Sequence, residues 1–135
     1  MKEPEWVPRE TVLALQERLL AGFGGASGIR DEGLLESALA RPLNRFAYEK
    51  PSLFELAASY AFGLVRNHPF LDGNKRIGFV TAVLFLEVNG YRFNATEVDA
   101  AVQTLALAAR KLGEADYTKW LEENSAKASG RKRAR

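Results

Sequence analysis

The chain has 135 residues, no cysteine, one histidine and a formal net charge of +2. This length corresponds to one domain with its own core, and the lack of cysteine excludes a disulfide framework, a thiolate zinc site and a cysteine nucleophile. The single histidine, His68, excludes a histidine-rich metal site and restricts histidine chemistry to one position.

The basic charge is concentrated at the C-terminus, where the last six residues include Arg131, Lys132, Arg133 and Arg135. Without them the acidic side chains outnumber the basic ones. Short terminal runs of this kind are usually solvated. We therefore expect one domain over 1–125 and a disordered basic tail over 126–135. Nucleic-acid binding is not expected, and the tail is the only segment whose charge would suit it.

The sequence has no membrane signal. No stretch approaches the roughly 20 apolar residues that a membrane-spanning helix needs. The N-terminal segment lacks the apolar core of a signal peptide. We expect a cytoplasmic protein that does not associate with membranes.

The first helix is predicted from Pro8, which suits a first turn, and from apolar residues at near-helical spacing: Val12, Leu13, Leu15, Leu19 and Leu20. The glycine-rich segment GFGGASG at 22–28 ends this helix. Its spacing matches neither GxxxxGK(S/T) nor GxGxxG, and it follows a helix rather than a strand. We interpret it as a turn and not as a phosphate loop.

A short second helix is expected over 32–40. Asp31 can cap its start, and Pro42 is expected to stop it, because proline removes a helical hydrogen bond. The following segment, LNRFAYEKP at 43–51, is then expected to be irregular.

Ser52 and Glu55 form the pattern of a capping box, which predicts a third helix over 53–67. A loop containing a proline follows at 68–72. The next predicted helix, 73–89, reads IGFVTAVLFLEV from its second turn onward and is apolar almost all round. A helix of that kind is buried on most sides, so we expect it at the centre of the fold.

The C-terminal part of the domain predicts two more helices. Thr96 can cap a helix over 97–112, Gly113 closes it, and a last helix follows over 114–124. Residues 91–94 form a brief extended link, and strand signals are otherwise nearly absent. The fold class is therefore all-α, with about six helices around one buried central helix.

One segment, HPFLDGNKR at 68–76, differs from the rest of the chain. It gathers the only histidine, a carboxylate, a glycine, an amide and two cations: His68, Asp72, Gly73, Asn74, Lys75 and Arg76. It stands at the start of the apolar helix, and a rigid, buried helix supports a well-positioned site.

These residue types point to phosphate chemistry. Helix N-termini present unpaired N–H groups and bind anions, and Gly73 leaves room for a phosphate to approach them. Lys75 and Arg76 lie in the first turn, where cations are unfavourable without a bound anion. Asp72 could hold Mg²⁺, and His68 could act as a general base.

Each residue also has a structural interpretation. Asp72 or Asn74 could cap the helix, the two cations could be solvated, and a lone histidine is more often structural than catalytic. Phe70 is expected in the core, where it would anchor the loop. The combination in one segment, rather than any single residue, favours a functional site.

The segment HPFLDGNKR resembles the Fic superfamily motif HxFx(D/E)(A/G)N(G/K)R at every defined position. Lys75 is similar to the death-on-curing (Doc) branch, whereas typical Fic adenylyltransferases carry glycine there and a second arginine three residues after the first. Phe79 stands at that second position. The resemblance covers most of 8–122 and includes FGGASGIRDEG, RFAYEK, SLFELAASYAFGLVRN and AVLFLEVNGY.

The resemblance implies an all-α Fic/Doc fold and an ATP-dependent toxin that phosphorylates a threonine of elongation factor Tu and arrests translation. It implies that His68 deprotonates the target hydroxyl and that Asp72 binds Mg²⁺. It further implies that Phe70 anchors the loop and that the phosphates are held by Gly73, Asn74, Lys75 and Arg76. A flap that aligns the target is expected at 43–51.

The resemblance also bears on regulation. Some Fic proteins inhibit themselves with an (S/T)xxxE(G/N) helix, and the chain has no such motif, because Gly28 precedes Glu32 and Lys119 precedes Glu123 at the required spacing. Doc-like toxins are instead neutralised by a small antitoxin whose C-terminal segment docks on the toxin. An apolar groove that receives a partner helix is therefore expected.

Two kinds of alternative to the kinase remain open at the level of sequence, another enzyme and a binding protein. An adenylyltransferase would use the same motif and differ in which phosphate faces the nucleophile. An inert Fic-like binding module, or a helical DNA-binding protein that uses the tail, would need neither His68 nor Asp72 for catalysis.

Overall fold

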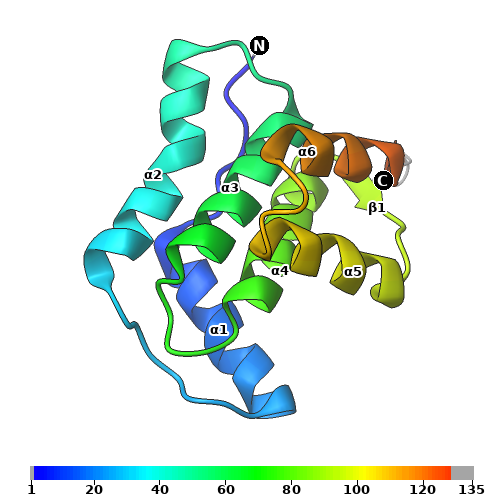
Figure 1. Cartoon of the computed structure of the whole chain (residues 1–135). Coiled ribbons are helices and arrows are strands. Elements are labelled where there is room, and N and C mark those ends of the chain that lie inside the picture. The colour runs from blue at the N-terminus through cyan, green and yellow to red at the C-terminus, as the bar shows by residue number, and fades with distance from the viewer. Residues whose placement is uncertain (1, 129–135) are drawn as a thin grey trace, which may run out of the picture.

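A computed structural model describes residues 2–128, which form six helices and one small two-stranded sheet (Figure 1). The helices and strands are α1 (Arg9–Phe23), α2 (Glu32–Tyr48), α3 (Leu53–Asn67), α4 (Asn74–Val88), β1 (Tyr91–Phe93), α5 (Glu97–Ala108), α6 (Glu114–Glu123) and β2 (Ser125–Lys127). The all-α prediction is confirmed. Across residues 2–128, no helix is both long enough and apolar enough to cross a bilayer.

Three of the predicted helix starts are confirmed by their caps. The Asp31 side chain accepts a hydrogen bond from the N–H of Leu34. Ser52 and Glu55 form both hydrogen bonds of a capping box. Thr96 caps α5 through the N–H of Asp99. These caps are worth about 1 kcal/mol each and fix where three of the helices begin.

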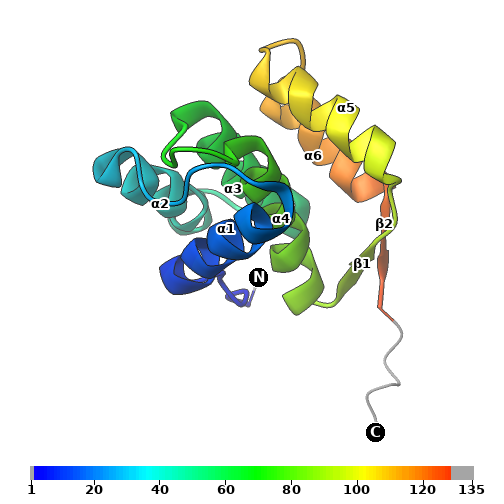
Figure 2. The ribbon, with the colours of Figure 1, turned by 90° about the horizontal axis from the view of Figure 1, so that it is seen from below.

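The most central helix is α3 rather than α4, which corrects the sequence-based expectation. α3 is buried along most of its length, and α2, α4, α5 and α6 all pack against it. α4 lies between α3 and α1, and Figure 2 shows α1 on one side of it and α5 with α6 on the other. Its half-buried side chains Phe79 and Val80 line a cleft, which is why this apolar helix is not buried all round.

Two glycines let α3 approach its neighbours closely. A methyl group at Gly63 would lie 3.1 Å from the Cα of Ala38 in α2. At Gly78 in α4 it would lie 2.7 Å from Cγ2 of Val65. The helix backbones are therefore packed more closely than a larger residue would allow.

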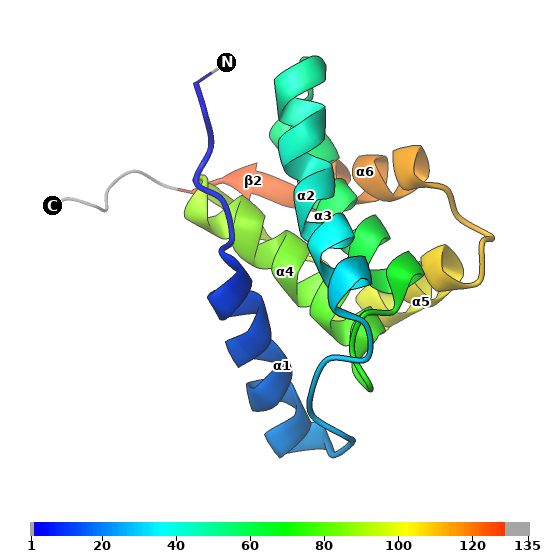
Figure 3. The same ribbon diagram turned by 90° about the vertical axis from the view of Figure 1, so that its left-hand side faces the viewer.

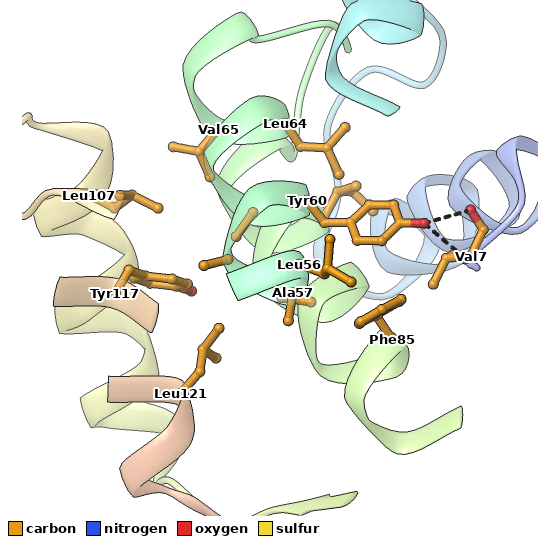
Figure 4. Close-up of a cluster of buried hydrophobic side chains, with 14 of the residues drawn as sticks. Val7, Leu56, Ala57, Tyr60, Leu64, Val65, Phe85, Leu107, Tyr117 and Leu121 are labelled. Atoms are coloured by element: carbon orange, nitrogen blue, oxygen red, sulfur yellow. Dashed lines mark hydrogen bonds between the residues drawn. The ribbon is translucent and has the colours of Figure 1, made fainter. Parts of the chain in front are cut away.

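The core around α3 contains two buried tyrosines, and the hydroxyl group of each has a hydrogen-bond partner (Figure 4). The N–H of Val7 donates a hydrogen bond of 3.0 Å to the hydroxyl of Tyr60. The hydroxyl groups of Tyr117 and Thr104 lie 2.9 Å apart and join α6 to α5. Burial raises the pKa of Tyr60 and raises the pKa of Tyr117 to about 12, because the phenolate form is poorly solvated in the core.

Pro42 does not stop α2, which continues to Tyr48. The prediction of a short helix over 32–40 and an irregular segment over 43–51 is therefore wrong. Tertiary contacts stabilise the second half: Phe46 packs edge-on against Trp6, and Arg45 bonds to Glu114 and Glu55. These contacts outweigh the roughly 3 kcal/mol that proline costs inside a helix.

The extended link at 91–94 is a strand. β1 pairs antiparallel with β2, and Arg92 faces Ala126 in the register. Residues 126 and 127, expected in the tail, therefore belong to this small sheet beside α6 (Figure 3). The four basic residues at 131–135 lie outside the described residues, so the expectation of a disordered tail concerns a segment that the structure does not describe.

Candidate active site

The segment 68–76 joins the two central helices. His68 is the C-terminal cap of α3, and Gly73 is the N-terminal cap of α4. The intervening loop therefore stands on the ends of two packed helices, which form the most buried pair of the fold. A loop held at both ends in this way can keep its side chains in fixed positions.

The loop between these helices is held in place by a buried side chain and by hydrogen bonds between its own residues. Phe70 is fully buried, and the side chain of Asn74, 3% exposed, accepts a hydrogen bond from its N–H and donates one to its C=O. The oxygen and the nitrogen of the Asn74 side-chain amide are therefore both hydrogen-bonded within the loop. Any contact of Asn74 with a phosphate would come from its backbone N–H, which is free of helical bonding in the first turn.

Asp72 does not cap α4, since Gly73 occupies the cap position and makes no side-chain cap bond. The Asp72 carboxylate instead accepts a 2.7 Å hydrogen bond from the N–H of Ala26. Its backbone carbonyl accepts one from the buried side chain of Gln16 in α1. Asp72 is exposed and held from two sides, as a ligand for a cation would need to be.

The glycine-rich segment 24–28 lies against the connection between α3 and α4, residues 68–73, which is called the motif loop. It is a turn, as predicted, and Gly24, Gly25 and Gly28 all have positive φ angles. A methyl group at Gly25 would lie 3.2 Å from Cβ of Asp72. From the sequence this turn is expected only as the end of a helix. The clustered glycines are in addition a signal of close backbone approach.

The first turn of α4 carries the two cations. Lys75 and Arg76 are both exposed, and no acidic side chain stands in this turn. The guanidinium carbon of Arg76 lies 4.0 Å from the centre of the Phe23 ring at the end of α1. Stacking on the ring orients the guanidinium without neutralising it, so its charge remains available for an anion.

A cleft of about 710 Å³ brings these residues together. His68, Asp72, Lys75 and Arg76 line one wall, together with Gly73 and Asn74. Its apolar side is formed by α1, α4 and α5: Leu19, Phe23, Phe79, Val80, Ala100, Ala101 and Leu105. A polar end next to an apolar wall suits a phosphorylated ligand that also carries a flat, apolar group.

The family described as Fic/DOC matches residues 6–86 of the chain. The chain belongs to this family. "Protein kinase doc" of Escherichia phage P1 is 37% identical over 91 residues, which are 66% of this chain and 72% of that protein. "Toxin Doc" of Mycolicibacterium smegmatis is 40% identical over 102 residues, which are 72% of this chain and 75% of that protein.

The Fic/DOC match spans α1 to α4 as far as Leu86, and therefore includes the whole motif loop and the glycine-rich segment. α5 lies beyond the matched residues. It nevertheless supplies one side of the cleft through Ala101 and Leu105. The site of this Fic/DOC protein thus combines the family-matched part of the chain with a wall from outside it.

The flap expected at 43–51 lies at the wrong end of this Fic/DOC fold. Figure 1 shows the C-terminal end of α2 and the start of α3 at the top, and the loop between α3 and α4 at the bottom. The 15 residues of α3 separate the two by about 22 Å. The segment beside the motif loop is instead 24–31, between α1 and α2.

A second cleft, of about 830 Å³, lies between the C-terminal half of α2 and α6. Both of its arginines are already paired with a carboxylate: Arg41 and Arg45 both bond to Glu114. It also lies at the start of α3, away from His68. The smaller cleft, which contains the segment 68–76, is therefore the candidate active site.

Asp72 fits a magnesium ion. Mg²⁺ in phosphate-transfer sites is usually held by one or two carboxylates together with substrate phosphates and water. Asp72 is an exposed carboxylate next to the helix N-terminus and two cations where phosphates would bind. Within residues 2–128, no group of three or more His, Asp or Glu side chains forms a metal cluster.

Proposed function

We propose that this Fic/DOC protein is the toxin of a toxin–antitoxin module and acts in the cytoplasm as an ATP-dependent protein kinase. Its target would be a threonine of a translation factor, with elongation factor Tu as the candidate that the resemblance indicates. The observation that carries the proposal is one cleft that holds His68, Asp72, Lys75 and Arg76 around the N-terminus of α4.

The proposed reaction is a direct transfer of the γ-phosphoryl group. His68 accepts the proton of the target hydroxyl as the hydroxyl oxygen forms a bond to the γ-phosphorus. The bond from that phosphorus to the β–γ bridging oxygen breaks, and ADP leaves. Lys75, Arg76 and the first N–H groups of α4 hold the phosphates.

Asp72 would hold the magnesium ion, which neutralises phosphate charge when it is bound. The N–H of Ala26 fixes one carboxylate oxygen, Oδ2. Phe70 and Asn74 keep the loop in place, since the Asn74 side chain bonds to the Phe70 backbone on both sides.

An adenylyltransferase is the second candidate. The position of the second Fic arginine is occupied by Phe79, whose ring packs near Phe93 and Trp120 at centroid distances of 5.7 and 6.3 Å. An aromatic side chain held in this cluster offers no charge to a triphosphate. This favours γ-phosphoryl transfer over transfer of AMP.

Labelled ATP distinguishes the two reactions. The protein would be incubated with elongation factor Tu and ATP labelled at either the γ or the α phosphate. The kinase proposal expects label on the target only from the γ position, and none with His68→Ala. Label from the α position alone would contradict it. Lys119→Ala, an exposed change on α6, serves as the control.

Toxicity in cells separates an enzyme from a binding module. Expression of the wild-type chain should arrest growth, and His68→Ala should remove the effect at equal protein level. A His68→Ala variant that is as toxic as the wild type would support the binding-module alternative instead.

The partner that fits the proposal is an antitoxin segment that folds as an amphipathic helix on the apolar side of the cleft. Leu19 and Phe23 of α1 face Ala101 and Leu105 of α5 across it. Leu105→Asp should prevent neutralisation by the co-expressed antitoxin, whereas Val88→Asp, at the far end of α4, should not. Neutralisation that survives Leu105→Asp would place the antitoxin elsewhere.

A further inference from the structure

His68 has an unusual backbone conformation. It follows α3 with φ 53° and ψ 52°, in the left-handed region, and it is one of two non-glycine residues with positive φ within 2–128. This backbone conformation is unfavourable for residues that have a Cβ atom. Such a conformation persists where surrounding contacts hold it, and it often occurs at functional sites.

The side chain of Arg30 makes contacts of this kind. Its Nε donates a 2.7 Å hydrogen bond to the carbonyl oxygen of His68. Its terminal nitrogen donates a second, of 3.1 Å, to the carbonyl oxygen of Asn67. The planar guanidinium therefore bridges the last residue of α3 and its cap, where helix carbonyls lack partners and the dipole favours a cation.

The backbone of the same segment holds the residues that follow. The N–H groups of Arg30 and Asp31 both donate to the carbonyl of Pro69, at 2.6 and 3.0 Å. The N–H of Leu71 donates to the carbonyl of Gly28. These backbone bonds would remain if the side chain of Arg30 were removed. The side chain therefore acts on residues 67 and 68, and the backbone acts on the rest of the loop.

We propose that Arg30 is a positioning residue that fixes the backbone of His68 and thereby the direction of its imidazole. The inference rests on the proposed function, in which His68 is the base. Arg30 does not line the cleft among the described residues. Its loss should therefore slow the chemical step without weakening nucleotide binding.

Steady-state kinetics provide the first test. Arg30→Ala should lower kcat about 10- to 100-fold, because small misplacements of a catalytic group have effects of this size. The KM for ATP should stay within about twofold, since the phosphate-holding residues of α4 are untouched. Arg30→Lys keeps the charge but lacks the planar guanidinium that donates to both carbonyls from fixed positions, so its kcat should be intermediate.

Nuclear magnetic resonance provides a test that does not depend on activity. His68 is the only histidine, so its ring signals are unambiguous. The wild type should give one narrow set, and Arg30→Ala should broaden or divide it. Arg9→Ala is the matched control, because it removes another arginine, partly exposed, that bonds nearby, to Glu32.

Three results would overturn the inference. They are an unchanged His68 signal together with unchanged kcat in Arg30→Ala, a rise in KM for ATP without a fall in kcat, and Arg9→Ala behaving as Arg30→Ala does. If Arg30→Ala does not fold, the same measurements on Arg30→Lys decide the question. A wild type that transfers no γ-phosphate would contradict the kinase proposal alone, since the ring signals still report on Arg30.

Discussion

The side chain of Asn74 bonds to both backbone polar groups of Phe70, at 2.9 Å to the N–H and 3.0 Å to the C=O. Both residues are buried, so these groups have no access to bulk water. The pair closes the motif loop on itself. The loop thus depends on one amide, which leads to a direct test.

Asn74→Ala should lower the free energy of unfolding by about 2–5 kcal/mol, because it leaves two buried backbone groups without a partner. Urea unfolding at neutral pH measures the change. Asn94→Ala is the control, since Asn94 is exposed and its backbone bond to Asn124 does not involve the side chain. A loss below about 0.5 kcal/mol would mean that the loop is held in another way.

Substitutions in the glycine-rich segment separate backbone strain from crowding of Asp72. Gly24 and Gly25 both have positive φ, so alanine at either should cost about 1–2 kcal/mol. Only Gly25→Ala places a methyl group 3.3 Å from Oδ2 of Asp72. We expect Gly25→Ala to slow phosphoryl transfer about tenfold more than Gly24→Ala does. Equal rates in the two variants would contradict the role of this contact.

The close packing of α3 predicts that two glycines cannot be replaced by alanine without a loss of stability. Alanine normally stabilises a helix interior by about 1 kcal/mol relative to glycine. Gly63→Ala and Gly78→Ala should instead destabilise by about 1–3 kcal/mol, because the added methyl groups meet Ala38 and Val65. Gly22→Ala in α1, with no atom within 4 Å, should not destabilise. Thermal unfolding of the three variants gives the comparison.

The buried hydroxyl of Tyr117 predicts a loss of stability in alkali. Its pKa is raised from 10.0 to about 12, so the folded state retains the proton more strongly than the unfolded state does. The stabilisation is complete below about pH 10 and disappears as the pH rises through about 12, with a size of about 2–3 kcal/mol.

Urea unfolding at about pH 9 and pH 11.5 measures this loss in the wild type and in Tyr117→Phe. The variant lacks the titrating group, so its stability should fall less between the two pH values. Tyr60 contributes in the same direction in both proteins and does not affect the comparison. An identical loss in the two would show that other groups cause the alkaline transition.

Prediction from the sequence succeeded where the signal was local. The caps at Asp31, Ser52 and Thr96 involve residues three apart, and each was found where expected. Prediction failed at Pro42, because the second half of α2 is stabilised by contacts with Trp6 and Glu114, which are distant in sequence, and with Glu55 in the next helix. The pairing of β1 with β2 was missed for the same reason, since the strands are separated by two helices.

By itself, the sequence determined the composition of the site: one histidine, one carboxylate and two cations at the start of a helix, in the segment 68–76. Only the tertiary structure decided what surrounds it. The contact of Ala26 with Asp72 and that of Arg30 with His68 join residues 46 and 38 positions apart. No local periodicity encodes such contacts, because they arise from the packing of α1 and α3 against α4.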